Sequence, residues 1–471
     1  MLFLTNSDFA ADISDVARQF FPNDKTKKTE SNTDFRLGFF VEHEKGFDKF
    51  TCIFDGHKTT SVCEIKSEWS DIEKKRFTKR AAKLCAYKCF WESTGKTMPW
   101  GALTGIRPTK LAYELKKEGV DDVEKYFKNI FFVSDKKAEM VSEILKNQQG
   151  LINQDEKNAD FYINIPFCVS RCSYCSFVSG EIAKQRKYVE PYIKALKKEI
   201  EATFQMVREA GYNIRNLYIG GGTPTSFSAD ELKEIFDSVL FDVSEFTVEA
   251  GRPDTIDKDK LTLFKERKVN RISINPQTFN QCTLDLINRK HTITDIYDKF
   301  ELSRSFGFDI NMDLIAGLPG ESYEMFCDSV KKAVELKPEN ITVHTLALKA
   351  GSFLKENSCV REECSDISKM LDFSGEVLKS NGYGPYYMYR QKYMAGNFEN
   401  VGYSIAGKQC VYNIDMMEET SSIFACGANA VSKRVFFSQN RIERFGDVKD
   451  FDNYINRIDE MIDKKRRFFG L

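Results

Sequence analysis

The chain has 471 residues, which exceeds the usual size of a single domain, so two or three domains are expected. Hydrophobic residues make up 42% of the chain and charged residues 30%, which is ordinary for a soluble globular protein. The 69 Lys and Arg residues nearly balance the 70 Asp and Glu residues, giving a formal net charge of -1. This balance argues against bulk binding of nucleic acid and leaves only local charged patches to consider.

The amino-terminal residues 1–15 contain neither a basic segment nor a long apolar run, so we expect no signal peptide. No stretch approaches the roughly 18 consecutive apolar residues that span a bilayer. The 13 cysteines do not indicate a disulfide scaffold, which is typical of short secreted domains. We therefore expect a cytoplasmic protein, in which closely spaced cysteines favour metal binding.

Residues 1–150 are predicted to form a separate α+β accessory domain. Its predicted strands are Arg36–Glu42, Phe50–Phe54 and a third around Ser61–Ile65. A helix then begins at a capping box formed by Ser70 and Glu73. This helix carries six basic residues: Lys74, Lys75, Arg76, Lys79, Arg80 and Lys83. We expect a solvated charged face there, and an RNA-contacting surface is the alternative.

From Asn158 onward, short strand-like runs alternate with amphipathic helices. The predicted strands are Phe161–Ile165, Asn216–Ile219, Phe246–Glu249, Arg271–Ile274, Ile310–Ile315 and Asn340–Leu346. The predicted helices are Tyr188–Ala210, Ala229–Leu240, Asp257–Glu266, Ile293–Ser305 and Tyr323–Leu336. Six βα repeats indicate a parallel sheet with right-handed crossovers. We expect a partial (β/α)6 barrel over residues 151–350, with ligands bound at the carboxyl ends of its strands.

The alternation fades after Ala350. A helix is predicted near Lys369–Lys379, followed by an aromatic stretch over Tyr383–Arg390. We interpret residues 351–471 as a C-terminal lid domain that covers the substrate at the mouth of the barrel.

A C-x3-C-x2-C motif follows the first barrel strand directly, with cysteines at Cys168, Cys172 and Cys175. Three thiolates on a short loop suit an iron–sulfur cubane whose fourth iron has no protein ligand. A structural zinc site requires four ligands, and neither a histidine nor a fourth cysteine lies close by in sequence. The motif therefore predicts a [4Fe–4S] cluster with one iron open to an exogenous chelator.

With this motif the chain resembles the radical S-adenosylmethionine (SAM) superfamily. Within it, the chain is similar to the oxygen-independent coproporphyrinogen III oxidase-like family, in its coproporphyrinogen dehydrogenase branch. The resemblance implies a radical SAM barrel and two cofactors, a [4Fe–4S] cluster and SAM. It also implies that a 5′-deoxyadenosyl radical abstracts hydrogen from the substrate, and that a flavodoxin- or ferredoxin-type protein donates the electron.

The resemblance also assigns SAM-binding residues, most of them at strand ends. The positions that match the family are Tyr162, Tyr174, Gly221, Gly222, Thr223, Glu249, Gln277, Arg289, Asp313 and Ala347. Tyr162 would lie near the sulfonium and Tyr174 near the adenine. The Gly220–Pro224 loop would approach the methionine ammonium, and Arg289 would meet the SAM carboxylate.

The resemblance further implies a tetrapyrrole substrate, with coproporphyrinogen III decarboxylated to protoporphyrinogen IX. Such a substrate needs cations for its propionates and aromatic walls for its macrocycle. The candidates are Arg252, Lys349, Arg390, Lys392, Tyr386, Tyr387 and Tyr389, for which a packed aromatic core is the alternative. Phe177 departs from the oxidases, which carry a further cysteine at that position. Anaerobic haem methylation and ring opening, or haem carriage without turnover, are therefore alternatives, with His344 as a haem-ligand candidate.

Overall fold

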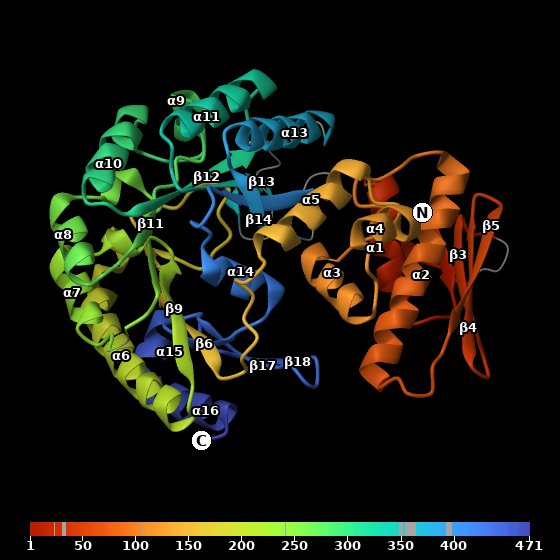
Figure 1. Cartoon of the computed structure of the whole chain (residues 1–471), viewed down its shortest axis with the longest axis horizontal. Coiled ribbons are helices and arrows are strands. Elements are labelled where there is room, and N and C mark those ends of the chain that lie inside the picture. The colour runs from red at the N-terminus through yellow and green to blue at the C-terminus, as the bar shows by residue number, and fades with distance from the viewer. Residues whose placement is uncertain are drawn as a thin grey trace. The chain divides into compact units, whose positions relative to one another are not determined.

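The structure, a computed structural model, describes residues 1–22, 24–30, 34–105, 107–240, 242–347, 352–353, 364–391 and 398–471. The chain divides into two compact units, Met1–Glu143 and Ile144–Leu471, and each unit has its own sheet (Figure 1). Among the described residues, no helix combines the length and the apolar character needed to cross a bilayer.

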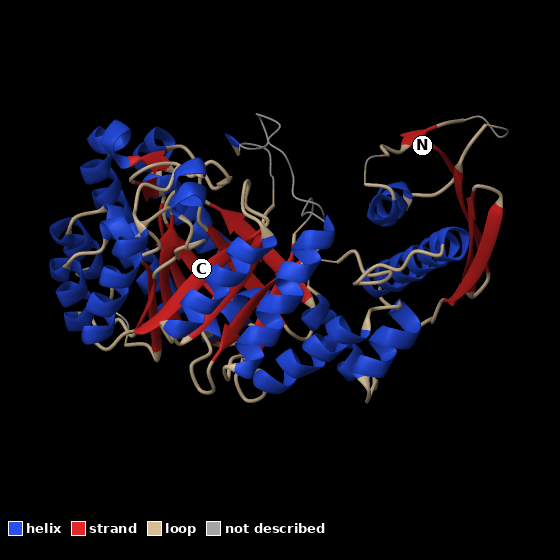
Figure 2. Cartoon of the chain, turned by 90° about the horizontal axis from the view of Figure 1, so that it is seen from above, coloured by secondary structure: helices blue, strands red, loops and turns tan. Residues whose placement is uncertain are grey.

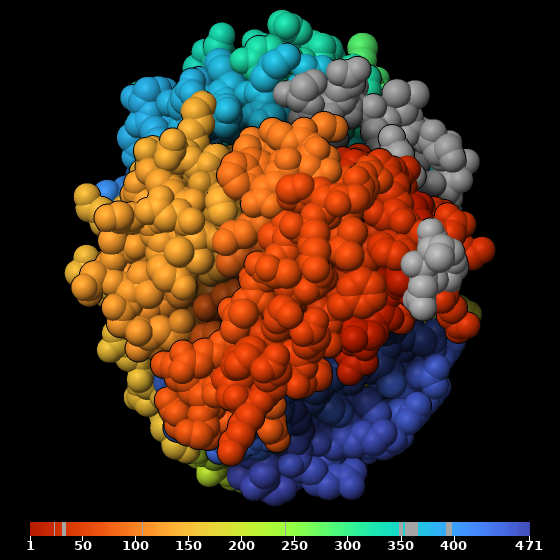
Figure 3. Space-filling model, turned by 90° about the vertical axis from the view of Figure 1, so that its right-hand side faces the viewer, coloured from red at the N-terminus to blue at the C-terminus, as the bar shows by residue number. Residues whose placement is uncertain are grey.

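The N-terminal unit is built on a sheet with strand order β2-β1-β3-β4-β5. Its strands are β1 (Leu2–Thr5), β2 (Lys27–Lys28), β3 (Leu37–Glu44), β4 (Phe47–Phe54) and β5 (His57–Glu64). Its helices are α1 (Ala10–Phe20), α2 (Asp71–Thr94), α3 (Pro108–Lys117), α4 (Val123–Phe131) and most of α5 (Asp135–Asn147). Figure 2 shows helices on one face of this sheet, and Figure 3 shows the surface of the unit in red to orange. The three predicted strands are confirmed, whereas β1 and α1 were not predicted.

Helix α2 begins at the predicted capping box. The Ser70 N–H donates to the Glu73 carboxylate at 2.9 Å, and the Glu73 N–H donates to the Ser70 hydroxyl at 3.3 Å. Four of its basic side chains form ion pairs with carboxylates of the same unit: Arg76 with Glu114, Arg80 with Glu118, and Lys79 and Lys83 with Asp12. Ion pairs within the unit therefore neutralise these four charges, and no bound nucleic acid is needed to explain them.

The second unit contains six neighbouring parallel strands in the order β13-β12-β11-β10-β9-β6. They are β6 (Asn158–Ile165), β9 (Asn213–Gly221), β10 (Glu245–Glu249), β11 (Arg271–Ser273), β12 (Asp309–Ala316) and β13 (Asn340–Thr345). The intervening helices cover the outer face of the strands in Figure 1: α6 (Ile182–Glu209), α7 (Ala229–Phe236), α8 (Lys258–Glu266), α9 (Gln281–Leu286), α10 (Ile293–Ser305) and α11 (Tyr323–Glu335). All six predicted strands and five predicted helices are confirmed.

The C-terminal residues extend this sheet at both edges to eleven strands. On one side, β15 (Glu399–Ser404) pairs antiparallel with β13, and β14 (Gly384–Arg390) pairs with β15. On the other side, β16 (Ser422–Cys426) pairs parallel with β6 and is followed by β17 (Val431–Phe436) and β18 (Arg441–Gly446). The accompanying helices are α13 (Cys364–Ser380), α14 (Val411–Glu418), α15 (Phe451–Asn456) and α16 (Ile458–Phe469). The described residues of this C-terminal part thus add strands to the core sheet. That residues 351–471 form a separate lid stays a prediction.

Helix α14 lies inside the curve of the sheet, near the amino-terminal ends of its strands (Figure 1). Glu245, the first residue of β10, accepts hydrogen bonds from the N–H groups of Val411 at 2.9 Å and Tyr412 at 3.0 Å. A carboxylate at this position satisfies the free amides of the helix and complements its dipole. The Tyr412 ring stacks on Tyr218 of β9 at 4.4 Å. The helix thus fills this end of the interior, and the carboxyl ends of the strands remain available for a ligand.

A buried ionic cluster joins α16 to the rest of the unit. The Lys465 ammonium forms an ion pair with Glu199 of α6 and lies 3.5 Å from Asp447. Glu199 also accepts from the Tyr454 hydroxyl at 2.5 Å and from the Gly427 N–H at 2.8 Å. Burial raises the pKa of Asp447 to about 8, while the surrounding anions raise the pKa of Lys465.

We predict that Lys465→Met lowers the stability of this unit, because Glu199 and Asp447 would be left buried without a cation. Breaking a buried ion pair on one side typically costs about 3–5 kcal/mol. The denaturant midpoint of the transition that unfolds the sheet measures the effect. Lys464→Met is the matched control, because its pair with Glu460 is partly exposed. Equal midpoints for the two variants would contradict the prediction.

Candidate functional site

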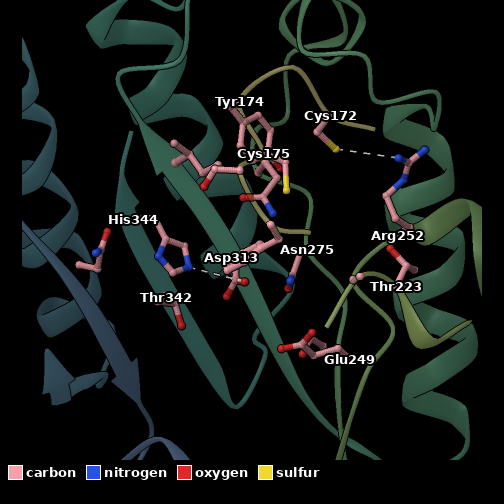
Figure 4. A pocket seen from close by; sticks show the side chains of 18 of the residues that line it. Cys172, Tyr174, Cys175, Thr223, Glu249, Arg252, Asn275, Asp313, Thr342 and His344 are labelled. Carbon is pink, nitrogen blue, oxygen red and sulfur yellow. Dashed lines mark hydrogen bonds and ion pairs between the residues drawn. The ribbon is translucent and has the colours of Figure 1, made fainter. Parts of the chain in front are cut away.

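A cavity of about 370 Å³ lies at the carboxyl ends of the six parallel strands (Figure 4). This is where parallel α/β folds place their ligands, because the loops after the strands converge there. Twelve of the thirteen predicted site residues line it: Cys168, Cys172, Tyr174, Cys175, Gly221, Gly222, Thr223, Glu249, Gln277, Arg289, Asp313 and Ala347. Segments almost 180 residues apart in sequence therefore contribute to one site.

The thirteenth predicted residue, Tyr162, does not line the cavity. Its ring stacks at 6.2 Å on Tyr218 and at 6.3 Å on Tyr412, and its hydroxyl donates to the Asn164 side chain at 2.9 Å. The aromatic cluster around α14 therefore holds Tyr162 against Tyr218 and Tyr412. The expected contact of its ring with a sulfonium stays a prediction.

The three cysteines lie on a loop that begins in the short strand β7 (Phe167–Cys168). Neighbouring backbone fixes this loop: the Ser173 N–H donates to Ile287 O at 3.0 Å, and Asn288 Nδ2 donates to Arg171 O at 2.7 Å. Burial raises the pKa of the Cys175 thiol to about 11. Within the described part of the chain, no group of three or more His, Cys, Asp or Glu side chains is placed to hold a single metal ion. An iron–sulfur cubane holds its thiolates farther apart than a single ion does, so the three cysteines around one cavity fit the larger group.

Two buried guanidinium groups lie beside Cys172. Arg252 Nη1 is 4.0 Å from the Cys172 sulfur, and Arg289 Nη1 is 3.9 Å from the same atom (Figure 4 shows the first contact). Arg289 also donates to Gly251 O at 2.7 Å, to Asn275 O at 2.6 Å and to the Tyr174 hydroxyl at 3.2 Å. Its assignment to the SAM carboxylate stays a prediction, because protein atoms already hold most of its donors.

The glycine-rich loop after β9 packs tightly against the cysteine loop. A Cβ atom on Gly222 would lie 2.5 Å from Phe167 O, and Gly221 adopts a φ of +117°. The Gly222 N–H donates to Ile165 O, and the Thr223 N–H donates to Phe167 O at 2.7 Å. Close backbone approach thus explains why this turn requires glycine, and it places the Thr223 hydroxyl 3.7 Å from the Cys168 sulfur.

Glu249 lies at the end of β10 and presents a carboxylate to the cavity. The Tyr218 hydroxyl donates to it at 2.7 Å, and the Gly221 N–H donates to it at 3.2 Å. Burial nevertheless raises its pKa to about 7, with a contribution from Asp313. Tyr218 was missed as a site residue. The available signal was its place in a parallel strand two residues before the glycine loop, because alternate side chains of a strand share one face.

Two buried oxygens that receive no hydrogen bond from the described residues line the wall that follows β11. They are Asn275 Oδ1 and Gln277 Oε1. Gln277 adopts a φ of +68°, which is unusual for a residue other than glycine. Its N–H donates to Asp313 O at 2.9 Å, and its carbonyl accepts from the Ile315 N–H at 3.0 Å. Such strain and unsatisfied polarity are typical of ligand sites. A cationic ligand rich in N–H and O–H donors, such as SAM, would satisfy these acceptors and Glu249.

The β13 side of the cavity adds a second polar group. His344 Nε2 lies 3.6 Å from an Asp313 oxygen, and its Nδ1 lies 3.5 Å from the Tyr389 hydroxyl (Figure 4 shows the first contact). Asn311 Nδ2 holds the other Asp313 oxygen at 2.8 Å. Both nitrogens of the His344 ring therefore have protein neighbours, which disfavours this residue as a haem ligand.

The residues expected to meet propionates and the macrocycle are only partly brought together. Tyr387 and Tyr389 line the cavity. Tyr386 and Arg390 are buried elsewhere in β14, and burial lowers the pKa of Arg390 to about 10. Lys349 and Lys392 lie outside the described residues.

We predict that Glu249→Gln removes a pH-dependent loss of stability. Below pH 4.5 the Glu249 carboxyl is protonated in both the folded and the unfolded chain. Between pH 4.5 and about 7 only the unfolded chain releases this proton, so wild-type stability falls as pH rises and stays reduced above that window. The variant should escape a loss of at most about 3.5 kcal/mol, since the pKa rises from 4.5 to about 7 and one pKa unit is worth about 1.4 kcal/mol.

Urea unfolding of both proteins across this pH window measures the difference. Glu190→Gln, an exposed change on α6 where Glu190 pairs with Lys194, should keep the wild-type profile. Parallel profiles for Glu249→Gln and wild type would contradict the prediction.

Comparison with known proteins agrees with this geometry. Residues 162–333 match the family model of the radical SAM superfamily. The chain is 37% identical to the oxygen-independent coproporphyrinogen-III oxidase-like protein HemZ of Bacillus subtilis (strain 168) over 392 residues, which are 80% of this chain and 78% of that protein. It is 38% identical to the heme chaperone HemW of the same organism over 192 residues, 39% of this chain and 49% of that protein.

Among solved structures, the coproporphyrinogen III oxidase HemN from Escherichia coli, a radical SAM enzyme, has the same fold. The TM-score is 0.53 at 22% sequence identity, covering 67% of this chain and 72% of that one. The chain therefore belongs to the radical SAM superfamily and, within it, to the family of oxygen-independent coproporphyrinogen-III oxidase-like proteins.

Proposed function

We propose that this protein is a radical SAM oxidoreductase that converts coproporphyrinogen III to protoporphyrinogen IX. The observation that carries the proposal is the cavity at the strand ends, where three cysteines, a carboxylate and unsatisfied acceptors lie beside aromatic side chains. The relative named as coproporphyrinogen-III oxidase-like, similar over most of both chains, supports this substrate class. From each of two propionates the reaction removes a hydrogen atom at the β-carbon, carbon dioxide and one electron, leaving a vinyl group.

Cys168, Cys172 and Cys175 would hold a [4Fe–4S] cluster, and the opposite wall would hold SAM. When bound, these cofactors supply one-electron reduction and a carbon-centred radical that abstracts hydrogen. Glu249 in its ionised form would attract the net positive charge of SAM. Asn275 and Gln277 would accept hydrogen bonds from it, and Ala347 would lie against the adenine. The electron would come from a flavodoxin- or ferredoxin-type protein.

The protein's part in this reaction is to orient the substrate and to exclude water. Tyr387 and Tyr389 give the cavity an aromatic side that suits the apolar faces of a macrocycle. His344 lies between Tyr389 and Asp313 and would help to hold the Tyr389 ring in place. A buried, preorganised site of this kind holds the reacting carbon close to the radical source and keeps the radical from reacting with solvent.

There are two alternatives, and a relative supports the first of them. The similarity to the heme chaperone HemW supports a haem-binding carrier without turnover. Anaerobic methylation and ring opening of haem would use the same cofactors on another tetrapyrrole. The position of His344 between Asp313 and Tyr389 favours the enzyme over a carrier that uses this histidine as an axial ligand.

The first test is anaerobic turnover. Protein with a reconstituted cluster receives SAM, a low-potential reductant and coproporphyrinogen III, and products are followed by liquid chromatography with mass detection. We expect the loss of one and then two formate-equivalent masses, each CO2 plus two hydrogens, matched by release of 5′-deoxyadenosine. Cleavage of SAM with an unchanged porphyrinogen would reject this substrate and make haem the next candidate. Stoichiometric binding of haem without release of 5′-deoxyadenosine would instead support the carrier.

We predict that replacing Cys168, Cys172 and Cys175 together by alanine abolishes cluster assembly, because no other described cysteine lines the cavity. Iron and sulfide analysis after reconstitution, together with the visible absorption of the cluster, measures the loss. Cys282→Ala is the matched control, because Cys282 is exposed on α9. A triple variant that retained a full cluster would overturn the assignment of the ligands.

A further inference from the structure

Arg252 occupies a position that SAM binding and substrate binding leave unexplained. It is 3% exposed and lies after β10, on the side of the cavity where the cysteine loop passes. Its Nε and Nη2 donate to the two oxygens of Asp254, each at 2.9 Å. Its Nη1 donates to the Ser170 hydroxyl at 2.9 Å and lies 4.0 Å from the Cys172 sulfur. Protein atoms therefore hold all three of its nitrogens, and the side chain is not free to bind a propionate.

We propose that Arg252, oriented by Asp254, is a positioning residue that raises the reduction potential of the cluster through Cys172. The inference rests on the three-cysteine cluster and is independent of which tetrapyrrole is the substrate. It concerns how easily the cluster is reduced, a property that can be measured without substrate.

The charges around Cys172 are asymmetric. Arg252 and Arg289 both approach its sulfur to within about 4 Å, and both are at least 96% buried. Asp254 supplies one negative charge, but it binds the face of the Arg252 guanidinium formed by Nε and Nη2. His291 lies 3.9 Å from Asp254, and burial next to Arg289 lowers its pKa to about 3, so it adds no charge at neutral pH. The net charge nearest the sulfur is positive.

Reduction adds one negative charge to the cluster. A nearby cation stabilises the reduced form more than the oxidised form and so raises the potential. Burial limits screening by water and salt, so the effect of these cations exceeds that of an exposed arginine at the same distance. Hydrogen bonds to the sulfur of a cluster ligand act in the same direction.

The two arginines differ in how many other contacts they make. Arg289 donates to the carbonyls of Gly251 and Asn275, so its replacement would also release the loops after β10 and β11. The contacts of Arg252 are one hydroxyl of the cysteine loop and the nearby Asp254. Arg252 is therefore the residue at which charge can be changed with less disturbance of the backbone.

The test is a potentiometric titration of the cluster-loaded, full-length protein without substrate. Electron paramagnetic resonance measures the amount of reduced cluster at each potential. For Arg252→Gln we expect a more negative midpoint. At a fixed solution potential, the ratio of reduced to oxidised cluster should fall roughly tenfold, which corresponds to about 59 mV for one electron. Arg252→Lys keeps the charge and should recover most of the wild-type midpoint.

For Asp254→Asn we expect the midpoint potential to shift in the opposite direction. This change removes the negative charge that partly neutralises Arg252, so the midpoint should become more positive. A purely structural role for the pair predicts that both variants loosen the same loop and shift the midpoint in the same direction. Arg304→Gln is the control for loss of a partly buried ion pair, because Arg304 pairs with Glu339 just before β13, at the opposite end of the sheet. Its midpoint should stay unchanged.

Shifts of the same sign for Arg252→Gln and Asp254→Asn, or an unchanged midpoint in Arg252→Gln with a full cluster, would overturn the proposal. If Arg252→Gln fails to assemble a cluster, the comparison of Arg252→Lys with Asp254→Asn decides the question. Because no tetrapyrrole enters the measurement, failure of this proposal is distinguishable from failure of the proposed decarboxylation.

Discussion

Backbone hydrogen bonds run from β6 through β9, β10, β11 and β12 to β13 and hold six strands parallel, so all six end at the same edge of the sheet. The carboxyl-terminal parts of the strands, with the loops that follow them, bring the cysteines, the glycine turn, Glu249, Gln277 and Asp313 to one cavity. None of these groups is near the others in sequence. A one-residue slip between neighbouring strands would turn their inward side chains to the opposite face and disperse the site.

The opposite end of the sheet is stabilised by other means. Glu245 binds the first amides of α14, and the rings of Tyr412, Tyr218 and Tyr162 stack beside that helix. Tyr218 belongs to both ends, because its ring packs on Tyr412 while its hydroxyl donates to Glu249. The aromatic cluster thus connects the packing of the interior to the orientation of a carboxylate in the cavity.

The parallel core could be predicted from the sequence because its signals are local. Each βα repeat has its own apolar strand and amphipathic helix, and the cysteine spacing follows the first strand directly. The C-terminal part could not be predicted in the same way. Strand β16 pairs with β6 across some 260 residues, and no feature near Ser422 in sequence indicates that partner.

At the site, sequence reasoning placed twelve of its thirteen cluster and SAM candidates at the cavity but did not predict the contacts that their side chains make. Arg289, named by the family resemblance, and Arg252, named as a candidate cation for propionates, both line the cavity. The hydrogen bonds to Gly251 O, Asn275 O and Asp254 depend on backbone that comes together only in the fold. Tyr162 is a further example. Its place on β6 could be predicted, but its stacking on Tyr218 and Tyr412 could not.

The pairing of β16 with β6 also affects the order in which the molecule is completed during synthesis. The strand that leads into the cysteine loop lacks one neighbour until Ser422–Cys426, some 260 residues later in the chain, has been made. A nascent or truncated chain that stops earlier would expose the hydrogen-bonding groups of this strand, and such an edge readily pairs with other chains. The surroundings of the cysteine loop are therefore finished only after this much later segment has left the ribosome.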